Sequence, residues 1–338
     1  MSLKLKNILP VCLAAALTAC GGHPIYSMGS SVVEDYADVI ATPHVLTITD
    51  VDATCQFGNN MAPFFASMNA LTESPRKTLS MLYLLSANCS EQNAISAELR
   101  SLRALQRGHV EEAKDARTEQ KRWLKLTAQR RQQSFESAMS AYEYDYNRVD
   151  AECPEFDSKQ DELVFLLGLL TGLQAILADA GAELAAGVPR NIAPVAERAA
   201  TCLDDEGWGR TPSAIRAGIW VLLPDLKTNK SIDPWEVLNA SSRESMAFGV
   251  RIPVALQAIM AETAGNTDEL MKALALLREP VTPNQEYALV DAIAVSHATA
   301  VSDRQWTLLH GERTPFGELG RSPFPEQEEE ASELDSLL

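Results

Sequence analysis

The sequence predicts an all-α protein of stacked antiparallel helix pairs around one apolar central helix, and three observations carry this prediction. Helix-start signals recur as a capping residue followed by proline, at Thr211-Pro212, Asp233-Pro234 and Thr282-Pro283. Aromatic residues make up only 6% of the chain, whereas alanine and leucine, both strong helix formers, are abundant. No segment shows the period-two alternation of a half-buried strand over more than a few residues.

The length and the net charge of the chain limit its domain number and its partners. The 338 residues suffice for one large domain or two ordinary ones, and a hydrophobic content of 46% excludes wholesale disorder. With 29 Lys and Arg against 46 Asp and Glu, the formal charge of the chain is −17. Such a surface repels phosphate backbones, so we expect no nucleic-acid partner.

Residues 1–19 have the features of a bacterial signal peptide. Lys4 and Lys6 form a short basic front, and the apolar stretch Ile8–Leu17 that follows is too short to span a bilayer. The segment leads into Leu17-Thr18-Ala19-Cys20, which resembles the lipobox, in which a cysteine is lipidated and becomes the new N-terminus. We therefore expect Cys20 to carry acyl chains that anchor a periplasm-facing protein to membrane lipid. An ordinary signal peptide with a chance cysteine is the alternative.

The residues after the cysteine bear on location and domain organisation. Gly21 stands where an aspartate would signal retention in the inner membrane, so the outer membrane is favoured and the inner membrane is the alternative. Residues 20–57 are predicted to form the lipidated N-terminus and a tether, and residues 58–310 the all-α body. Residues 311–338 contain eight acidic residues and three prolines, which predicts a disordered acidic tail.

Cysteines give a second prediction. Once Cys12 leaves with the signal peptide and Cys20 takes lipid, four remain, namely Cys55, Cys89, Cys153 and Cys202. An even number in an oxidising periplasm favours two disulfides, for which three connectivities exist. We predict Cys55–Cys89 and Cys153–Cys202, because sequence neighbours in a helical stack are usually spatial neighbours. Four buried reduced thiols are the alternative, and without a CxxC motif or a Cys/His cluster we expect no metal site.

Within the body, helix signals follow one another closely. Ser74-Pro75 is predicted to start one helix and Ser90 the next, which ends at Gly108, and a long helical pattern then runs over Val110–Ala151. Later helices are expected to end at glycines, namely Gly187, Gly249 and Gly265. No strict 34-residue tetratricopeptide period is present, so the pattern indicates at most a degenerate array of that kind.

Residues 100–131 carry a net positive charge in a chain whose net charge is negative, with ten Lys and Arg against four acidic residues. The first interpretation is the solvated face of a long helix. The second is a docking face for an acidic partner or for anionic lipid headgroups. The candidates for docking are Arg117, Lys121, Arg122, Lys125, Arg130 and Arg131.

The segment Leu163–Ala178 is apolar on all sides. With sixteen residues and Gln174 among them, it is too short and too polar at one end for a membrane span. It is predicted as the central core helix, in which Gly168 and Gly172 permit close crossing of a neighbour. The alternative is that part of it lines a cavity for a hydrophobic ligand, with the candidates Leu166, Gly168, Leu169, Gly172, Leu173, Ile176 and Trp220.

Groups suited to catalysis are few. The five histidines lie far apart, none belongs to an HExxH motif, and no GxSxG, P-loop or GxGxxG is present. The run Asp204-Asp205-Glu206 falls in an expected loop, where solvated carboxylates are the simpler interpretation. We expect neither enzymatic activity nor a cofactor.

Several packing motifs resemble those of one known family. They are Leu166–Ile176, Val188–Pro194, Gly207–Pro212, Ile219–Pro224 and Gly249–Arg251. Together with the lipobox and the helical pattern, they resemble the T-component lipoproteins of TRAP transporters, over roughly Leu79–Leu277. The long basic helix, the four cysteines and the acidic tail depart from the family pattern.

The resemblance implies tetratricopeptide-like helix pairs, a central hydrophobic pore or pocket, and a tendency to form homotrimers. It also implies a periplasmic solute-binding protein as partner and, for some members, uptake of hydrophobic compounds alongside FadL-like outer-membrane channels. The first hypothesis is therefore a non-catalytic accessory lipoprotein in the uptake of a hydrophobic solute, such as a fatty acid, an alkane or a lipid-like compound. The alternative is a helical-repeat scaffold for envelope assembly with no small-molecule ligand.

Overall fold

The computed structural model describes residues 24–68, 75–148 and 150–324. Over these ranges its regular structure is helical throughout, without strands, which confirms the all-α prediction. The signal peptide, Cys20 and residues 325–338 lie outside the described residues, so what the sequence predicts for them stays a prediction.

The N-terminal half contains the longest helices. In chain order its elements are α2 (Pro24–Tyr36), the π-helical η2 (Ala37–Ala41), α3 (Thr42–Leu46), α4 (Val51–Ser67), α5 (Arg76–Gln106), α6 (Val110–Ala141) and α7 (Lys159–Gly181). The C-terminal half consists mostly of short helices. Its elements are α8 (Ile192–Ala199), η4 (Ala200–Cys202), α9 (Thr211–Leu222), η5 (Pro224–Leu226), α10 (Pro234–Phe248), α11 (Ile252–Ala264), α12 (Thr267–Leu276), η6 (Gln285–Tyr287) and α13 (Ala288–His310).

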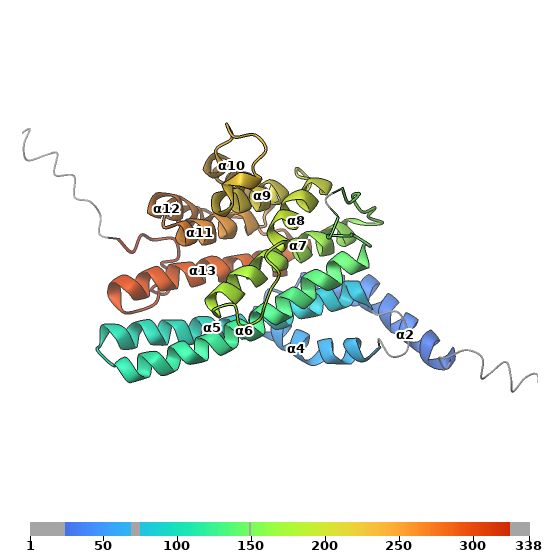
Figure 1. Cartoon of the computed structure of the whole chain (residues 1–338), viewed down its shortest axis with the longest axis horizontal. Helices are drawn as coiled ribbons and strands as arrows, with labels where there is room; N and C mark the ends of the chain where they lie inside the picture. The colour runs from blue at the N-terminus through green and yellow to red at the C-terminus, as the bar shows by residue number, and fades with distance from the viewer. Residues whose placement is uncertain (1–23, 69–74, 149, 325–338) are drawn as a thin grey trace, which may run out of the picture.

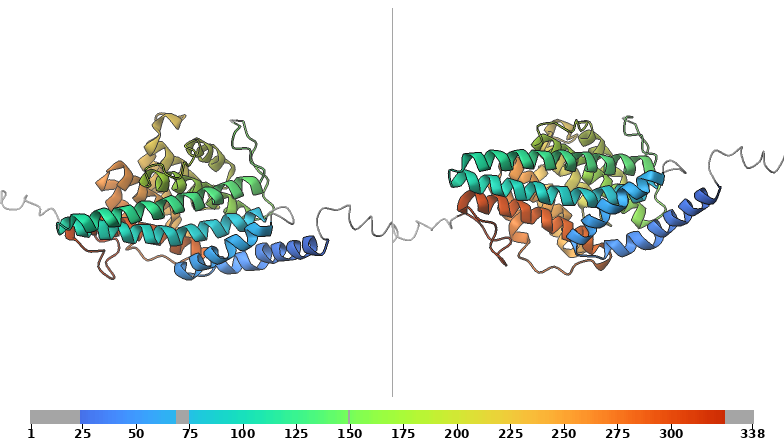
Figure 2. Two further views of the ribbon diagram at one scale, coloured as in Figure 1. Left: turned by 60° about the horizontal axis from the view of Figure 1, so that its bottom comes forward. Right: turned by 90° about the horizontal axis from the view of Figure 1, so that it is seen from below.

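Neighbouring helices in the sequence pack against each other in space. α5 and α6 form a long antiparallel hairpin along one side of the molecule, with α4 against α5 and α7 against α6 (Figure 1). The short helices α8 to α12 stack on the other side of α7, and α13 runs beside both α5 and α11. Seen from below, α2 projects away from the body (Figure 2). The array fits stacked helix pairs, whereas its tetratricopeptide-like character remains a prediction.

The apolar helix α7 occupies the centre of this arrangement. Every residue from Asp161 to Gly172 is buried. Ser158 caps the helix by accepting a hydrogen bond from the Asp161 backbone N–H. The helix therefore begins before the apolar stretch Leu163–Ala178 and is longer than it. By length and composition alone α7 is able to cross a membrane, but most of its apolar stretch is buried inside the protein. It is the core helix that the sequence predicts.

Gly168 and Gly172 mark the places where α7 touches its neighbours most closely. A Cβ atom on Gly168 would lie 2.3 Å from Ala138 Cβ of α6. On Gly172 it would lie 2.6 Å from Phe135 Cδ2 of α6 and 2.8 Å from Ile192 Cγ2 of α8. No side chain fits at either contact, so both glycines permit close helix crossing.

Both predicted disulfides are present. Cys55–Cys89 joins α4 to α5, and Cys153–Cys202 joins the loop between α6 and α7 to η4. Near the first of them, a Cβ on Gly58 would lie 2.6 Å from the Ser86 backbone nitrogen, so α4 lies directly against α5. The two bonds therefore hold an N-terminal helix and a long loop against the body.

Several predicted helix boundaries are confirmed and others are wrong. α10 begins at the predicted signal with Asp233 as its cap, whereas α9 begins at Thr211 itself, with Arg210 in the cap position. α10 and α11 end at Gly249 and Gly265, which both have positive φ. Ser90 does not begin a helix but lies inside α5, where its hydroxyl donates to the Ala87 carbonyl one turn back instead of capping a helix start. α6 ends ten residues before Ala151, and Gly187 lies in the loop after α7. α13 begins at Ala288, because Asn284 rather than Thr282 caps the preceding turn.

Residues 37–57 and 311–324, predicted as parts of a tether and a disordered tail, contact the body. Residues 37–57 are largely helical, and the Asp38 carboxylate accepts a 2.9 Å hydrogen bond from Thr78 Oγ1 of α5. After α13, the Thr314 backbone N–H donates to Asp303 Oδ1 at 3.1 Å, and His310 Nε2 donates to the Pro323 carbonyl at 2.7 Å. Residues 311–324 thus lie against α13, in contrast to the disorder expected from residue 311 onward.

We expect Gly168→Ala to lower the free energy of unfolding by about 1–3 kcal/mol, because the new methyl group would overlap Ala138 Cβ. Gly29→Ala is the matched control, since a Cβ at Gly29 meets no atom within 4 Å on an exposed helix. Chemical denaturation of both variants measures the difference. Equal stability of Gly168→Ala and the wild type would show that α6 and α7 can separate at no cost.

Candidate functional site

A cavity of about 330 Å³ lies beside the second half of α7, where this helix faces α9 and α11. We call it the aliphatic cavity. Most of its lining is aliphatic, including Leu170, Leu173, Ile176, Leu177, Val188, Ala193, Ile215, Ile219, Leu256, Ile259 and Met260. The Asp179 carboxylate, also in the lining, accepts hydrogen bonds from the backbone N–H groups of Ala186 and Val188, at 2.7 and 2.9 Å. The charge of Asp179 is therefore compensated within the protein, and the cavity is suited to hydrocarbon.

The rim of the aliphatic cavity exposes leucine side chains to water. Leu184, Leu222 and Leu223 line the cavity and are 52%, 39% and 43% exposed. Leu184 also has a positive φ of 62°, unusual for leucine, and its N–H donates to the Asp179 carbonyl at 2.8 Å. A single exposed leucine is ordinary, but several around the opening of an aliphatic cavity are typical of a binding site for an apolar molecule.

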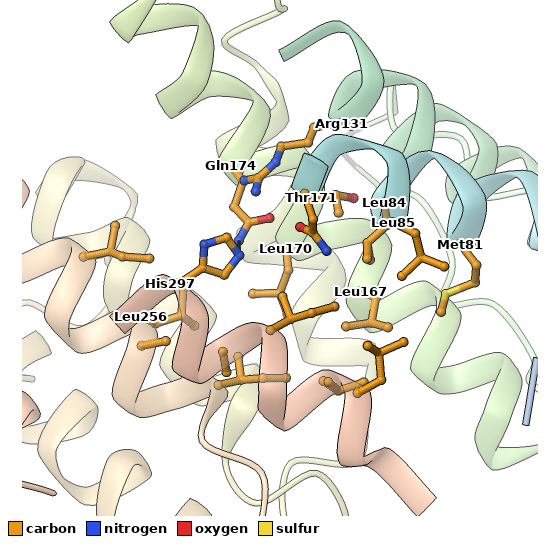
Figure 3. Close-up of a pocket in the computed structure, with 18 of the residues that line it drawn as sticks. Met81, Leu84, Leu85, Arg131, Leu167, Leu170, Thr171, Gln174, Leu256 and His297 are labelled. Atoms are coloured by element: carbon orange, nitrogen blue, oxygen red, sulfur yellow. Dashed lines mark hydrogen bonds between the residues drawn. The ribbon is translucent and has the colours of Figure 1, made fainter. Parts of the chain in front are cut away.

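A smaller cavity of about 60 Å³ lies deeper, between α5, α7, α11 and α13. We call it the inner cavity. It adjoins the aliphatic cavity, because both are lined by Leu170, Gln174, Leu256 and Ile259. The polar residues of its lining lie to one side, interspersed with the apolar Leu170 and Leu256 (Figure 3). Polar side chains gather on one side, namely Arg131, Thr171, Gln174 and His297, and the apolar ones toward the other, namely Met81, Leu84, Leu85 and Leu167.

A chain of polar contacts joins four helices at the polar side of the inner cavity. Arg131 of α6 is only 2% exposed, and its guanidinium pairs with Glu91 of α5. Glu91 Oε2 also lies 3.4 Å from His297 Nδ1 of α13. Gln174 Nε2 of α7 lies 3.4 Å from His297 Nε2. Because an amide nitrogen can only donate, His297 Nε2 accepts and the Nδ1 hydrogen points to Glu91.

The pKa values of this network fit the neutral histidine. Burial lowers the pKa of His297 below its ordinary value, and the attraction of Glu91 only partly opposes this effect. Burial alone would raise the pKa of Glu91, but the attraction of Arg131, His297 and Arg304 outweighs it, so the pKa is lowered. The network therefore contains one carboxylate, one guanidinium and one neutral imidazole.

Two hydrogen-bond donors at the inner cavity have no partner among the described residues. They are Asn88 Nδ2 of α5 and Nε of Arg131. Asn88 is 6% exposed, so bulk water does not reach its amide freely. A buried donor without an acceptor is costly, by about 1–3 kcal/mol, and such groups are found where a ligand or an ordered water binds.

A third cavity, of about 360 Å³, lies on the other side of this network, and we call it the charged cleft. Arg304 of α13 pairs there with Glu98 Oε2 at 3.2 Å and with Glu262 Oε2 at 2.6 Å. Gln174 and Ile259 line all three cavities. These two residues therefore mark the place where the aliphatic, inner and charged spaces meet.

The structure divides the predicted cavity residues into two groups. Leu173 and Ile176 line the aliphatic cavity. The others line none of the three cavities and instead pack in the core, namely Leu166, Gly168, Leu169, Gly172 and Trp220. Trp220 donates to Glu197 Oε1 at 3.2 Å and stacks under Arg216. On α7, Leu166, Gly168, Leu169 and Gly172 face the packed core, whereas Leu167, Leu170 and Thr171 line the inner cavity and Leu173 and Ile176 line the aliphatic cavity.

The predicted basic docking residues fall into two groups, one buried or paired and one exposed. Arg131 is buried in the network described above, and Arg130 is partly buried and donates to the Ser86 carbonyl at 2.7 Å. Lys121 pairs with Glu183 at 2.6 Å. The exposed residues among the candidates are Arg117, Arg122 and Lys125. The long basic helix is thus partly neutralised by its neighbours.

The structure adds functional candidates that sequence reasoning missed. Asn88 and Glu91 lie on α5 and His297 lies on α13, far away in the sequence, so no motif joins His297 to the other two. The burial of Arg131 could have been predicted from the sequence, because Arg131 lies three residues after the buried Ala128 and four before the buried Phe135, on the same face of the helix. Among the described residues, no group of three or more His, Cys, Asp or Glu side chains is placed to hold a metal ion.

Comparisons of the chain with protein-family models, with curated proteins and with solved structures find no match.

We expect Arg131→Met to reduce the free energy of unfolding by about 3–5 kcal/mol, because it leaves the Glu91 carboxylate buried without its guanidinium. The control is Arg122→Met on the exposed face of the same helix, which should change stability by about 0.5 kcal/mol or less. Urea denaturation followed by circular dichroism measures both. If the two variants were equally stable, the ion pair would not contribute to folding.

Proposed function

We propose that the protein is a non-catalytic lipoprotein that binds an aliphatic solute and takes part in its uptake across the periplasm. One observation carries the proposal, namely the cavity of about 330 Å³ with an aliphatic lining and a leucine rim. Each methylene group that leaves water contributes about 0.8 kcal/mol, so a chain of ten such groups gains about 8 kcal/mol before the entropic cost of binding. Hydrocarbon chains of fatty acids, alkanes or similar compounds suit such a site.

The proposed location rests on the sequence and on the cysteines. The lipobox-like segment supports an acyl anchor at Cys20, and the two disulfides fit an oxidising compartment such as the periplasm. The resemblance to T-component lipoproteins supports a role beside a solute-binding protein or a FadL-like channel, and assembly into homotrimers. The outer membrane is the favoured site of the anchor.

A second candidate function is a scaffold for envelope proteins without a small ligand. It is favoured by apolar side chains that α2 and η2 expose, namely Val32, Tyr36, Val39 and Ile40. Their spacing places several of them on one side of the helical segment, where a partner helix could pack. Native mass spectrometry of the purified protein distinguishes the two functions: a co-purifying aliphatic compound supports solute binding, and a ligand-free chain that captures assembly factors supports the scaffold.

We expect Ile176→Trp to abolish binding of aliphatic compounds while the protein stays folded, because the indole fills the aliphatic cavity rather than the packed half of α7. Leu308→Trp is the control, since Leu308 is exposed on α13 and lines none of the three cavities. Binding of a fluorescent fatty acid and the melting temperature are measured for both. Unchanged binding by a folded Ile176→Trp variant would exclude the aliphatic cavity as the binding site.

Cys20→Ala should leave the protein without acyl chains and strongly reduce solute uptake, because the anchor sets the concentration of the protein at the membrane. Mass spectrometry of the purified protein and growth on fatty acids as the carbon source are the measurements. An acyl mass that persists on the Cys20→Ala variant would place the anchor at another residue.

A further inference from the structure

The helical segment formed by α2 and η2 has one side that the body covers and one side that water reaches. On the covered side, Val33 and the buried Ala37 pack in an apolar cluster with side chains of α4 and α5. Asp38 holds this side in place, because its carboxylate accepts a hydrogen bond from Thr78 and its carbonyl accepts one from Gln160 of α7 at 2.7 Å. The end of the segment is therefore fixed to the body, and its uncovered side has a defined direction.

The uncovered side of this segment is apolar. Four side chains, which we call the α2 face, are between 55% and 69% exposed, namely Val32, Tyr36, Val39 and Ile40. Spacings of four, seven and eight residues from Val32 place them on one side of a helix. They lie where the segment projects from the body (Figure 2). Apolar side chains gathered in this way are typical of a surface that contacts another apolar surface.

The composition of the segment indicates what kind of surface the α2 face contacts. Residues 24–50 contain no Lys or Arg but four acidic residues, Glu34, Asp35, Asp38 and Asp50. Attraction to anionic headgroups or to an acidic protein therefore contributes nothing here, and the contact depends on apolar area alone. Tyr36 has an amphipathic ring, of the kind that is enriched where hydrocarbon meets headgroups. The α2 face thus suits the interface of a membrane without net charge.

The place of the α2 face in the chain indicates the partner. Cys20, the proposed site of acylation, stands four residues before Pro24, where α2 begins. Four residues span at most about 14 Å when fully extended, so acyl chains on Cys20 bring the start of α2 to the bilayer surface. Contact of the α2 face with the same bilayer is then an intramolecular step, which needs little intrinsic affinity because the anchor supplies a high effective concentration. A protein partner in solution has no such advantage.

We propose that the α2 face lies in the headgroup region of the membrane that holds the acyl anchor. This inference rests on the proposed lipoprotein function and adds to it a second contact with lipid, made by protein side chains. An acyl anchor alone leaves the body free to rotate on its tether, whereas a helix in the interface does not. Because Ala37 and Asp38 fix η2 to the body, the second contact sets the orientation of the body on the bilayer.

The test uses the full-length acylated protein in phosphatidylcholine vesicles, with a spin label on one added cysteine. The four body cysteines are held in disulfides and Cys20 carries lipid, so the label reacts with the added thiol. Val39→Cys places it on the α2 face. Val110→Cys is the matched control, because Val110 is a valine 51% exposed at the start of α6, at the opposite end of the molecule from α2 (Figure 1).

We expect the label at position 39 to lie about 5–10 Å below the headgroup boundary, the depth of helices that lie in the interface. Oxygen, which concentrates in hydrocarbon, should then relax this label strongly, and a water-soluble nickel chelate should relax it weakly. The label at position 110 should show the reverse. Neither result should change with salt, because the proposed contact involves no basic side chain.

The outcomes separate this inference from the proposed anchor, since mass spectrometry of the same samples reports whether Cys20 is acylated. If the protein is acylated and the nickel chelate reaches both labels equally, the inference is wrong and the anchor stands. If the label at position 39 is immobilised and shielded from both agents, a second copy of the chain or another protein covers the α2 face, which also overturns the inference. Protein without acyl chains refutes the anchor and, with it, the inference.

A second pair of variants covers the case in which the added cysteine disturbs the disulfides. Tyr36→Trp places an indole on the α2 face, and Leu308→Trp places one on the exposed side of α13. Lipids brominated in their acyl chains quench a tryptophan that enters the bilayer. Above the signal of the five native tryptophans, brominated lipid should quench the fluorescence added by Tyr36→Trp but not that added by Leu308→Trp. Equal quenching of the two variants would contradict the inference.

Discussion

Burial of α7 is the constraint on which the rest of the structure depends. A helix that is apolar on all sides gains stability only when other elements cover every side of it, and its residues from Asp161 to Gly172 are all buried. α6 and α8 approach it at Gly168 and Gly172, where a side chain would collide with Ala138, Phe135 or Ile192. The helix pairs before and after α7 are thereby brought to opposite sides of the same element.

The aliphatic cavity lies beside the part of α7 that follows Gly172. There Leu173, Ile176 and Leu177 face a space that is also lined by residues of α9 and α11. The space of about 330 Å³ is open to solvent at its leucine rim, and its aliphatic lining is of the kind that ligand pockets have. One helix thus supplies side chains both to the packed core and to the candidate site.

Burial of the polar network costs free energy, in contrast to burial of the apolar helix α7. Removing the Arg131 and Glu91 charges from water is unfavourable, and their mutual attraction and the contact with His297 offset that cost only in part. The network fixes the relative position of α5, α6, α7 and α13, and the Nδ2 of Asn88 and the Nε of Arg131 are enclosed by the protein without an acceptor among the described residues. Groups kept at such a cost are expected at functional sites.

The sequence by itself determined the all-α class, the core position of α7, the pairing of its four body cysteines and the packing role of Gly168, because each depends on local pattern or on neighbours along the chain. It placed Leu173 and Ile176 at a cavity but grouped them with residues that only pack. The burial of Arg131 and the meeting of Glu91 with Arg131 and His297 were decided by the tertiary structure alone. Helical periodicity states which residues share a face, whereas which helix covers that face, and how closely, depends on contacts between segments far apart in the chain.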